Sequence, residues 1–163
     1  MADSIRPCLT FKDRAEEAVK FYVSLFPNSR IVSLSKVERD GGPIPKGKLL
    51  NATFELDGRE YIAFDGGDGF TFTEGISLMA TCKTQDEVDR YWKALAANGG
   101  EEGPCGWLKD RFGVSWQIVP EVLGKMLSDP NSGDAEACMN AMLKMKKLDI
   151  ATLEKAYKGA PVA

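Results

Sequence analysis

The N-terminal part of the chain alternates between two hydrophobic periodicities. Residues 5–11 alternate apolar and polar side chains as a strand does, and the period then lengthens to that of a helix. The apolar face of this helix consists of Ala15, Ala18, Val19, Tyr22 and Phe26. Strand-like segments follow at residues 31–37, 49–56 and 60–64, with the tight-hairpin pair Asp57-Gly58 between the last two. The pattern therefore predicts a strand, a helix and three strands.

The second part of the chain repeats this order with different residues. Residues 76–82 predict a strand, and short strands are also expected at residues 106–108 and 114–119. The helix between them has the apolar face Val88, Tyr91, Trp92, Leu95 and Ala96. Because the order of elements recurs although the residues do not, we predict two related modules.

Capping motifs suggest where the two helices begin. Asp13 with Glu16, and Thr84 with Glu87, have the spacing of a capping box. We therefore expect Asp13 and Thr84 to cap the first and second helix.

Residues 121–163 predict a helical extension. One apolar stripe consists of Ala135, Cys138, Met139, Met142 and Leu143, and a second of Ile150, Leu153 and Tyr157. The methionine-rich stripe is typical of core or dimer packing, and a surface that adapts to a ligand is the alternative.

Composition narrows the classes of partner. The 163 residues include 44% hydrophobic and 28% charged residues, and 21 Lys and Arg stand against 24 Asp and Glu. This slightly acidic balance favours neither nucleic acid nor an anionic membrane as partner. The longest uncharged runs, residues 21–29 and 112–120, are far shorter than the roughly 20 residues of a membrane span. With no signal-peptide core at the N-terminus, we expect a cytoplasmic protein.

The chain contains no histidine. Catalytic triads with histidine, a histidine general base and histidine-containing zinc sites are therefore excluded. The four cysteines, Cys8, Cys82, Cys105 and Cys138, lack the spacings of zinc or redox motifs. We expect them to be free thiols, buried or half-buried, in a reducing compartment.

Several segments together resemble one known family. They are PCLTF at 7–11, AEEA at 15–18, FYVSLFP at 21–27, TQDEVD at 84–89, YW at 91–92, CGWLKD at 105–110 and FGVSWQIVP at 112–120. In this order they resemble the PhnB-like family, often labelled 3-demethylubiquinone-9 3-methyltransferase. That family is part of the vicinal oxygen chelate superfamily, with glyoxalase I, bleomycin resistance proteins and extradiol dioxygenases. The resemblance covers residues 5 to about 125.

The resemblance implies an α+β fold of two βαβββ modules, whose curved mixed sheets surround a cleft. The modules would span about residues 5–65 and 75–120 of a single domain at 1–125, followed by the helical extension at 121–163. The label of a methyltransferase does not suit the sequence, because the glycine-rich stretch 66–69 lies between two predicted strands. No helix N-terminus follows it to bind a cofactor.

Metal-dependent members of the superfamily hold a divalent ion with four side chains, from the first and last strand of each module. Carried over by register, these positions fall near residues 6–8 and at Ala63, Ser77 and Gln117. Alanine has no donor atom, serine is a poor neutral ligand and Arg6 would repel a cation. Asp65 enters the set only if the register shifts by two. We therefore predict no metal and no other cofactor.

Without the metal site, the resemblance still implies a cleft. Strand alternation and the aromatic residues predict that it is lined by Cys8, Thr10, Phe64, Asp65, Ser77, Met79, Trp107 and Gln117. Core packing is the alternative for each of these positions, and above all for the tryptophans.

Three functions are compatible with these observations. The first is a metal-free homodimer that binds a small organic ligand, as the drug-sequestering members of the superfamily do. The second is a glyoxalase-like lyase or isomerase, which would use a divalent metal or a carboxylate such as Asp65 or Asp110 with Gln117. The third is partner binding, which predicts a large apolar surface patch in place of a cleft. We favour the first.

Overall fold

The computed structural model describes residues 5–42, 44–129 and 132–159. The chain divides into two compact units, residues 1–71 and 72–163, which are described separately. That the two modules form a single domain at 1–125 stays a prediction. In the described part of the chain, no helix is long and apolar enough to cross a membrane.

The first unit is a four-stranded sheet with one helix. Its elements are β1 (Cys8–Phe11), α1 (Ala15–Leu25), β2 (Arg30–Lys36), β3 (Leu49–Leu56) and β4 (Arg59–Asp65). The strand order is β1-β4-β3-β2, with β1 parallel to β4 and the other pairs antiparallel. The predicted βαβββ order is therefore confirmed, with strand ends that differ by a few residues.

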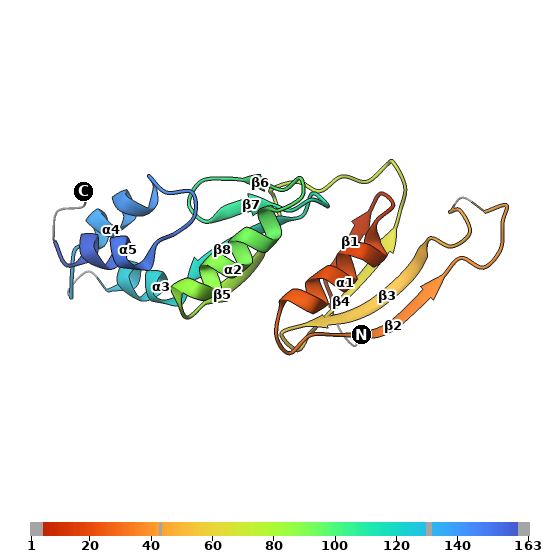
Figure 1. The fold of residues 1–163 in the computed structure, drawn as a ribbon, viewed down its shortest axis with the longest axis horizontal. Helices are drawn as coiled ribbons and strands as arrows, with labels where there is room; N and C mark the ends of the chain where they lie inside the picture. The colour runs from red at the N-terminus through yellow and green to blue at the C-terminus, as the bar shows by residue number, and fades with distance from the viewer. Residues whose placement is uncertain (1–4, 43, 130–131, 160–163) are drawn as a thin grey trace. The chain divides into compact units, whose positions relative to one another are not determined.

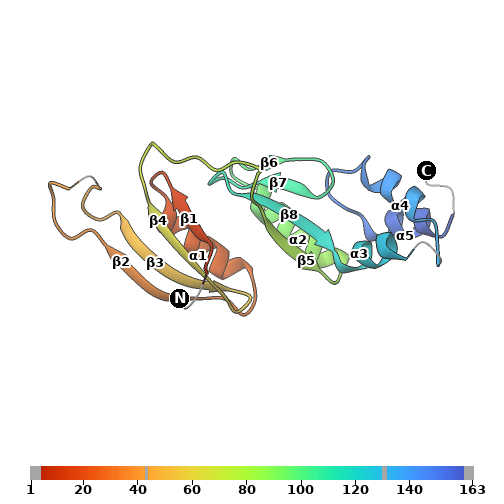
Figure 2. The same cartoon turned by 180° about the vertical axis from the view of Figure 1, so that it is seen from behind.

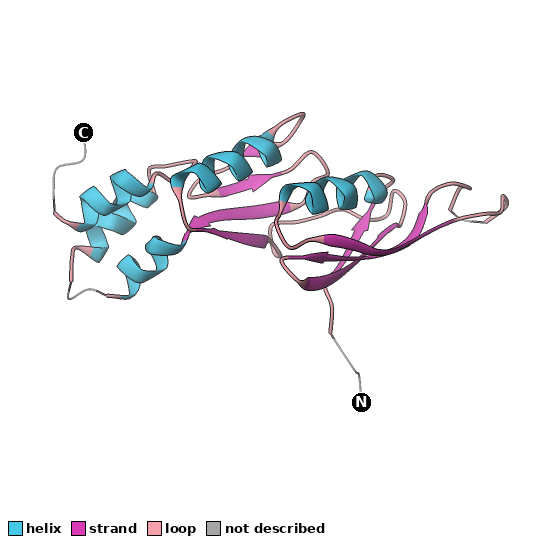
Figure 3. Cartoon of the chain, turned by 60° about the horizontal axis from the view of Figure 1, so that its bottom comes forward, coloured by secondary structure: helices cyan, strands magenta, loops and turns pink. Residues whose placement is uncertain are grey.

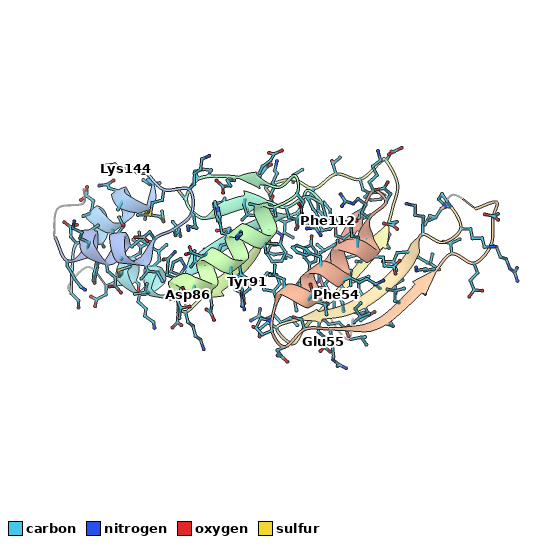
Figure 4. All side chains as sticks on the ribbon, in the orientation of Figure 1. Phe54, Glu55, Asp86, Tyr91, Phe112 and Lys144 are labelled. Carbon is cyan, nitrogen blue, oxygen red and sulfur yellow. The ribbon has the colours of Figure 1, made fainter. Side chains whose placement is uncertain are left out.

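Strand alternation gives this sheet one covered face and one open face. The helix α1 covers one face, as Figure 1 shows, and Figure 2 presents the unit from behind. Phe54 is fully buried on the covered face, whereas the next residue, Glu55, is half-buried on the opposite face (Figure 4). The buried hydrophobic side chains of the strands are Leu9, Phe11, Leu49, Ala52, Phe54, Leu56 and Ala63.

The helix α1 begins differently from the prediction. Its N-cap residue is Arg14, and the Arg14 side chain forms no capping hydrogen bond. The capping box expected at Asp13 is therefore wrong. The buried carboxylate of Asp65, at the end of β4, accepts hydrogen bonds from the backbone N–H of Ala15 (2.8 Å) and of Leu49 (3.0 Å). Asp65, which is 50 positions from Ala15 in sequence, therefore caps the helix in place of a neighbouring residue.

The second unit repeats the arrangement. Its elements are β5 (Leu78–Cys82), α2 (Gln85–Ala96), β6 (Glu101–Glu102), β7 (Trp107–Lys109) and β8 (Ser115–Pro120). The strand order is β5-β8-β7-β6, with β5 parallel to β8. Here the predicted cap is confirmed: the Thr84 hydroxyl accepts a hydrogen bond from the Glu87 backbone N–H, while the Glu87 carboxylate accepts one from the Lys83 backbone N–H. The two-residue strand β6 was not anticipated.

Three short helices complete the second unit: α3 (Glu121–Ser128), α4 (Ala135–Met142) and α5 (Ile150–Tyr157). They confirm the helical extension over the described residues, whereas residues 130, 131 and 160–163 lie outside them. Figure 3 shows these helices beyond the end of β8. Their buried core consists of Leu123, Met126, Cys138, Leu148 and Leu153. Met139 and Leu143, from the same predicted stripe, are instead exposed.

Polar contacts attach the extension to the sheet. The side-chain amide of Gln85, in the first turn of α2, donates to the Leu148 carbonyl (3.1 Å) and accepts from the Ile150 N–H (2.8 Å). The backbone N–H of Gly106 donates to the Lys146 carbonyl (2.7 Å). Gly106 has φ +83°, and a Cβ there would lie 2.8 Å from the Ile118 carbonyl oxygen, so this position requires glycine.

The four cysteines are free thiols, as predicted. Cys82 and Cys138 are buried and Cys105 is half-buried, but Cys8 is exposed, which corrects the expectation that all four are at least half-buried. Burial raises the pKa of Cys82 to about 12, with a smaller contribution from Glu87, and burial also raises the pKa of Cys138.

The Asp65 cap predicts a large loss of stability in Asp65→Ala. The substitution leaves two buried N–H donors unpaired, at about 1–3 kcal/mol each, so we expect the free energy of unfolding to fall by roughly 2–4 kcal/mol. Urea denaturation measures it. Asp13→Ala is the matched control and should change stability by less than about 0.5 kcal/mol. A larger loss for Asp13→Ala than for Asp65→Ala would contradict this assignment of the cap.

Thiol burial predicts selective modification of the native protein. Because burial raises the pKa of Cys82 and keeps it as the neutral thiol, Cys8 should react with iodoacetamide while Cys82 and Cys138 stay unmodified. Peptide mapping by mass spectrometry measures this, and all four should react in denaturant. Modification of native Cys82 as fast as Cys8 would show that its environment is not the buried one described.

Candidate ligand-binding site

The open face of the second sheet carries a group of polar and aromatic side chains. Trp116 and Ile118 of β8 are buried on the α2 side, so Ser115 and Gln117 project from the opposite face. The register places Gln117 between Trp107 of β7 and Met79 of β5. Three predicted cleft residues, Met79, Trp107 and Gln117, therefore form one row across this face.

The fourth predicted residue of this unit joins the row through a hydrogen bond. The side-chain amide of Gln117 donates to the hydroxyl oxygen of Ser77 at 2.8 Å. Ser77 lies just before β5 and is half-buried, as is Gln117, while Met79 is 59% exposed. Ser77, Met79, Trp107 and Gln117, which the sequence analysis placed in one cleft, therefore lie together on this face.

A cavity of about 440 Å³ lies at the β6–β7 edge of this sheet. It is lined by Glu74, Glu101, Glu102, Gly103, Pro104, Trp107, Leu108, Lys109 and Ser115. The side chain of Ser115 is buried, with the residue only 2% exposed, and its hydroxyl oxygen has no hydrogen-bond partner in the described part of the chain. A buried hydroxyl without a partner is unfavourable, so its position in the wall of a cavity suits a ligand that completes its hydrogen bond.

Charged groups surround this hydroxyl. The ammonium group of Lys109 forms an ion pair with the Glu74 carboxylate. Its hydrogen bond to Glu74 raises the pKa of Lys109 and lowers the pKa of Glu74, and the nearby charge of Glu101 also raises the pKa of Lys109. Glu101 lies opposite Lys109 in the β6–β7 pairing. Lys109 and Glu74 are therefore in their charged forms at neutral pH.

The open face of the first sheet carries the other predicted residues, with one exception. Cys8 is exposed and Thr10 and Phe64 are half-buried, and Thr10 lies opposite Phe64 in the β1–β4 register. Asp65 follows Phe64 and therefore projects to the covered face, where its carboxylate accepts the two backbone hydrogen bonds described above. Strand alternation therefore separates Asp65 from Thr10 and Phe64, which lie on the open face.

Asp110, the other carboxylate considered for catalysis, is also occupied by the fold. It is 3% exposed and accepts hydrogen bonds from the backbone N–H groups of Phe112 (2.9 Å) and Val114 (3.0 Å). Its second oxygen accepts from the indole Nε1–H of Trp116 at 2.9 Å. Asp110 thus shapes the β7–β8 turn and holds Trp116 in the core.

The positions expected for a superfamily metal ion do not fit one. Ala63 is fully buried on the covered face, and its open-face neighbours, Ile62 and Phe64, have no donor atoms. Arg6 forms an ion pair with Glu60, and Ser77 and Gln117 are neutral. Within the described residues, no three Cys, Asp or Glu side chains converge as a metal site requires. The donor chemistry at these positions is therefore unsuited to a divalent cation.

All five polar side chains of the cavity wall were absent from the predicted site: Glu74, Glu101, Glu102, Lys109 and Ser115. Ser115 and Lys109 share strand parity with Gln117 and Trp107, so alternation alone could have identified them. Glu74 lies in a loop, and Glu101 belongs to the unanticipated strand β6, so no periodic pattern pointed to either.

The glycine-rich stretch at 66–69 is a loop, as predicted. Residues 66–77 contain no helix between β4 and β5, so no helix N-terminus follows the glycines. A cofactor site of the strand–glycine turn–helix type is therefore not formed at this stretch.

Comparisons with known proteins agree on the family and the fold. The family model described as 3-demethylubiquinone-9 3-methyltransferase matches residues 3–119. A putative 3-demethylubiquinone-9 3-methyltransferase, PhnB protein, from Bacillus cereus is 38% identical, and the match covers 72% of this chain and 99% of that one with a TM-score of 0.66. None of the curated proteins matches the sequence.

Two more distant structures share the fold. Protein PA1353 from Pseudomonas aeruginosa is 24% identical over 74% of this chain and 98% of that one, with a TM-score of 0.56. The fosfomycin resistance protein FosX from Listeria monocytogenes, in complex with Mn(II) and sulfate, is 16% identical over 78% and 98%, with a TM-score of 0.53. With its paired βαβββ units and its match to the family model over most of its length, this chain belongs to the 3-demethylubiquinone-9 3-methyltransferase (PhnB-like) family and has the fold of the vicinal oxygen chelate superfamily.

Proposed function

We propose that this protein is a cytoplasmic homodimer that binds a small organic molecule on the open faces of its sheets, without a metal ion or other cofactor. The observation that carries the proposal is the buried, unpartnered hydroxyl of Ser115 in the wall of the 440 Å³ cavity. Cavities that bind small molecules measure about 300–1,000 Å³ and combine apolar walls with a few polar groups. Trp107 and Pro104 provide such walls here.

Binding without a metal is supported by the residues at the expected metal positions. A catalytic zinc site uses about three protein ligands with an open position. The expected metal positions offer the neutral Ser77 and Gln117, already bonded to each other, and the exposed thiol of Cys8. An ion would have to break the Ser77–Gln117 hydrogen bond to gain two weak ligands.

An enzyme that relies on a carboxylate base is less well supported. Asp65 and Asp110 both accept several hydrogen bonds from the fold, so neither is available to remove a proton from a substrate. The cavity carboxylate of Glu74 has a lowered pKa, whereas a general base at neutral pH needs a raised one. Methyl transfer, which the family's description names, has no support from the glycine-rich loop described above.

Elemental analysis tests the absence of a metal. Untagged protein is equilibrated in turn with Mg²⁺, Mn²⁺, Fe²⁺, Ni²⁺ and Zn²⁺ and then desalted, because a histidine tag would add the ligands that this chain lacks. We expect far less than one ion per subunit in every case. One retained ion per subunit would contradict the proposal, and Ser77→Ala together with Gln117→Ala would then show whether the open face holds it.

A ligand screen tests binding directly. Thermal-shift screening of a small-molecule library should give compounds that stabilise the protein. Isothermal titration should show that Trp107→Ala weakens their binding by about tenfold or more, because the indole wall is lost. Met139→Ala, an exposed residue of α4, is the matched control and should leave affinity unchanged. A library without a single stabilising compound, or hits that are indifferent to Trp107, would refute binding at this face.

The edge of the second sheet supports a homodimer. Among the described strands of this sheet, β5 pairs with β8 alone in the order β5-β8-β7-β6, so its other edge can accept a second strand. Met79 is 59% exposed and Ile76, just before β5, is 68% exposed. An open edge with exposed apolar side chains suits contact with a second copy of the chain about a two-fold axis.

Light scattering tests this interface. We expect the native protein to have twice the 17.8 kDa mass of the chain and Met79→Glu to shift it toward the monomer. Leu143→Glu, an exposed apolar residue after α4, should leave the mass unchanged. A monomeric native protein would refute dimerisation, and dissociation by Leu143→Glu alone would place the interface in the C-terminal extension.

A further inference from the structure

The cavity at the β6–β7 edge has an unequal balance of charge. Its wall includes three glutamates, Glu74, Glu101 and Glu102, and a single lysine, Lys109. The Glu74 carboxylate neutralises the Lys109 ammonium group in an ion pair. An anionic ligand would therefore have to displace Glu74 from Lys109 and then lie among the remaining carboxylates.

The two other glutamates, Glu101 and Glu102, differ in the hydrogen bonds that they already accept. The Glu102 carboxylate accepts a hydrogen bond from the Trp92 indole Nε1–H at 2.8 Å, which ties it to the covered face. Glu101 is exposed at the rim, and no side chain in the described part of the chain donates a hydrogen bond to it. Glu101 is thus the carboxylate that can bind a cation without losing a hydrogen bond within the described residues, although Lys109 lies opposite it.

The rest of the wall suits an apolar body next to that cation. Trp107 and Pro104 form apolar surface in the same cavity wall as Glu101. The face of an indole ring attracts organic cations through its quadrupole, more strongly than the rings of Phe or Tyr do. A flat or alkyl group can pack against Trp107 while its ammonium end lies near Glu101.

The Ser115 hydroxyl is an independent observation that points to a bound molecule. It is nearly inaccessible to solvent and has no hydrogen-bond partner in the described part of the chain, and its residue is part of the cavity wall. A hydroxyl can accept a hydrogen bond from an ammonium or hydroxyl group or donate one to an oxygen. A ligand that carries such a group would satisfy it.

We propose that this cavity binds an organic ammonium ion with an aromatic or alkyl body, with the ammonium group near Glu101, the body against Trp107 and a hydrogen bond to Ser115. This inference rests on the proposed function, because it names the class of ligand for the same open face. The inference is narrower than the proposed function, because it excludes anionic ligands.

Titration calorimetry with three matched probes tests the inference. The probes are 2-phenylethylamine, 2-phenylethanol and phenylacetate, which share an aromatic body and differ in charge, and the full-length untagged protein is used at pH 7 and low salt. We expect the amine to bind about tenfold more tightly than either other probe. Its affinity should fall as salt is added, because the attraction to Glu101 is screened.

Variants locate the binding. Glu101→Gln should weaken binding of the amine by about threefold or more, while Glu136→Gln on α4 is the matched control and should leave affinity unchanged. Ser115→Ala should also weaken binding, and because its hydroxyl has no partner the variant should melt at or above the temperature of the native protein. That combination separates a ligand contact from a structural role.

Other outcomes overturn the inference in distinct ways. If phenylacetate binds most tightly and Lys109→Met abolishes its binding, the cavity is an anion site, and the inference fails while small-molecule binding stands. If the amine binds equally well to Glu101→Gln, the assignment of Glu101 is wrong. If none of the probes binds at about 10 mM, the inference fails, and the library screen alone decides the proposed function.

Discussion

The alternation of side chains along the strands is the constraint on which the rest of the structure depends. In each sheet one set of residues packs under a single helix, and the other set is left on an open face. Trp116 and Trp107 illustrate the division: the first lies in the core with its indole N–H bonded to Asp110, and the second lies on the open face. A shift of register by one residue would exchange the two sets, so fold and site are specified together.

The same division separates the acidic residues into two kinds. Asp65 and Asp110 project into the fold and accept backbone N–H groups, which makes them part of the architecture. Glu74 and Glu101 lie at the rim of the cavity, where their charges face solvent and any ligand. The two buried carboxylates therefore stabilise the fold. The polar groups that can contact a ligand are Glu74 and Glu101 at the rim and the Ser115 hydroxyl.

Much of the fold could be predicted from sequence because both hydrophobic periodicities are strong, and the order of elements repeats. The cap at Thr84 was predictable because its partner, Glu87, is local. The cap of α1 was not, because it comes from Asp65, which only the folded sheet brings to Ala15. Ala63, carried over from the family as a metal position, is buried on the covered face. Long-range residue pairing and the exact register of the strands are the features that are hardest to predict from a single sequence.

The central claim is that ligands bind on the open face of the second sheet, beside Trp107. The three tryptophan indoles report on it separately, because Trp92 and Trp116 donate their indole N–H groups to Glu102 and Asp110 within the fold. The most direct measurement is a ¹H–¹⁵N NMR spectrum of the three indoles with and without the tightest compound from the library screen, assigned with Trp107→Phe. The account predicts a large shift of the Trp107 resonance and small shifts of the other two. A shift of Trp116 with an unmoved Trp107 would show that ligands enter the helix-covered core, and would contradict the account.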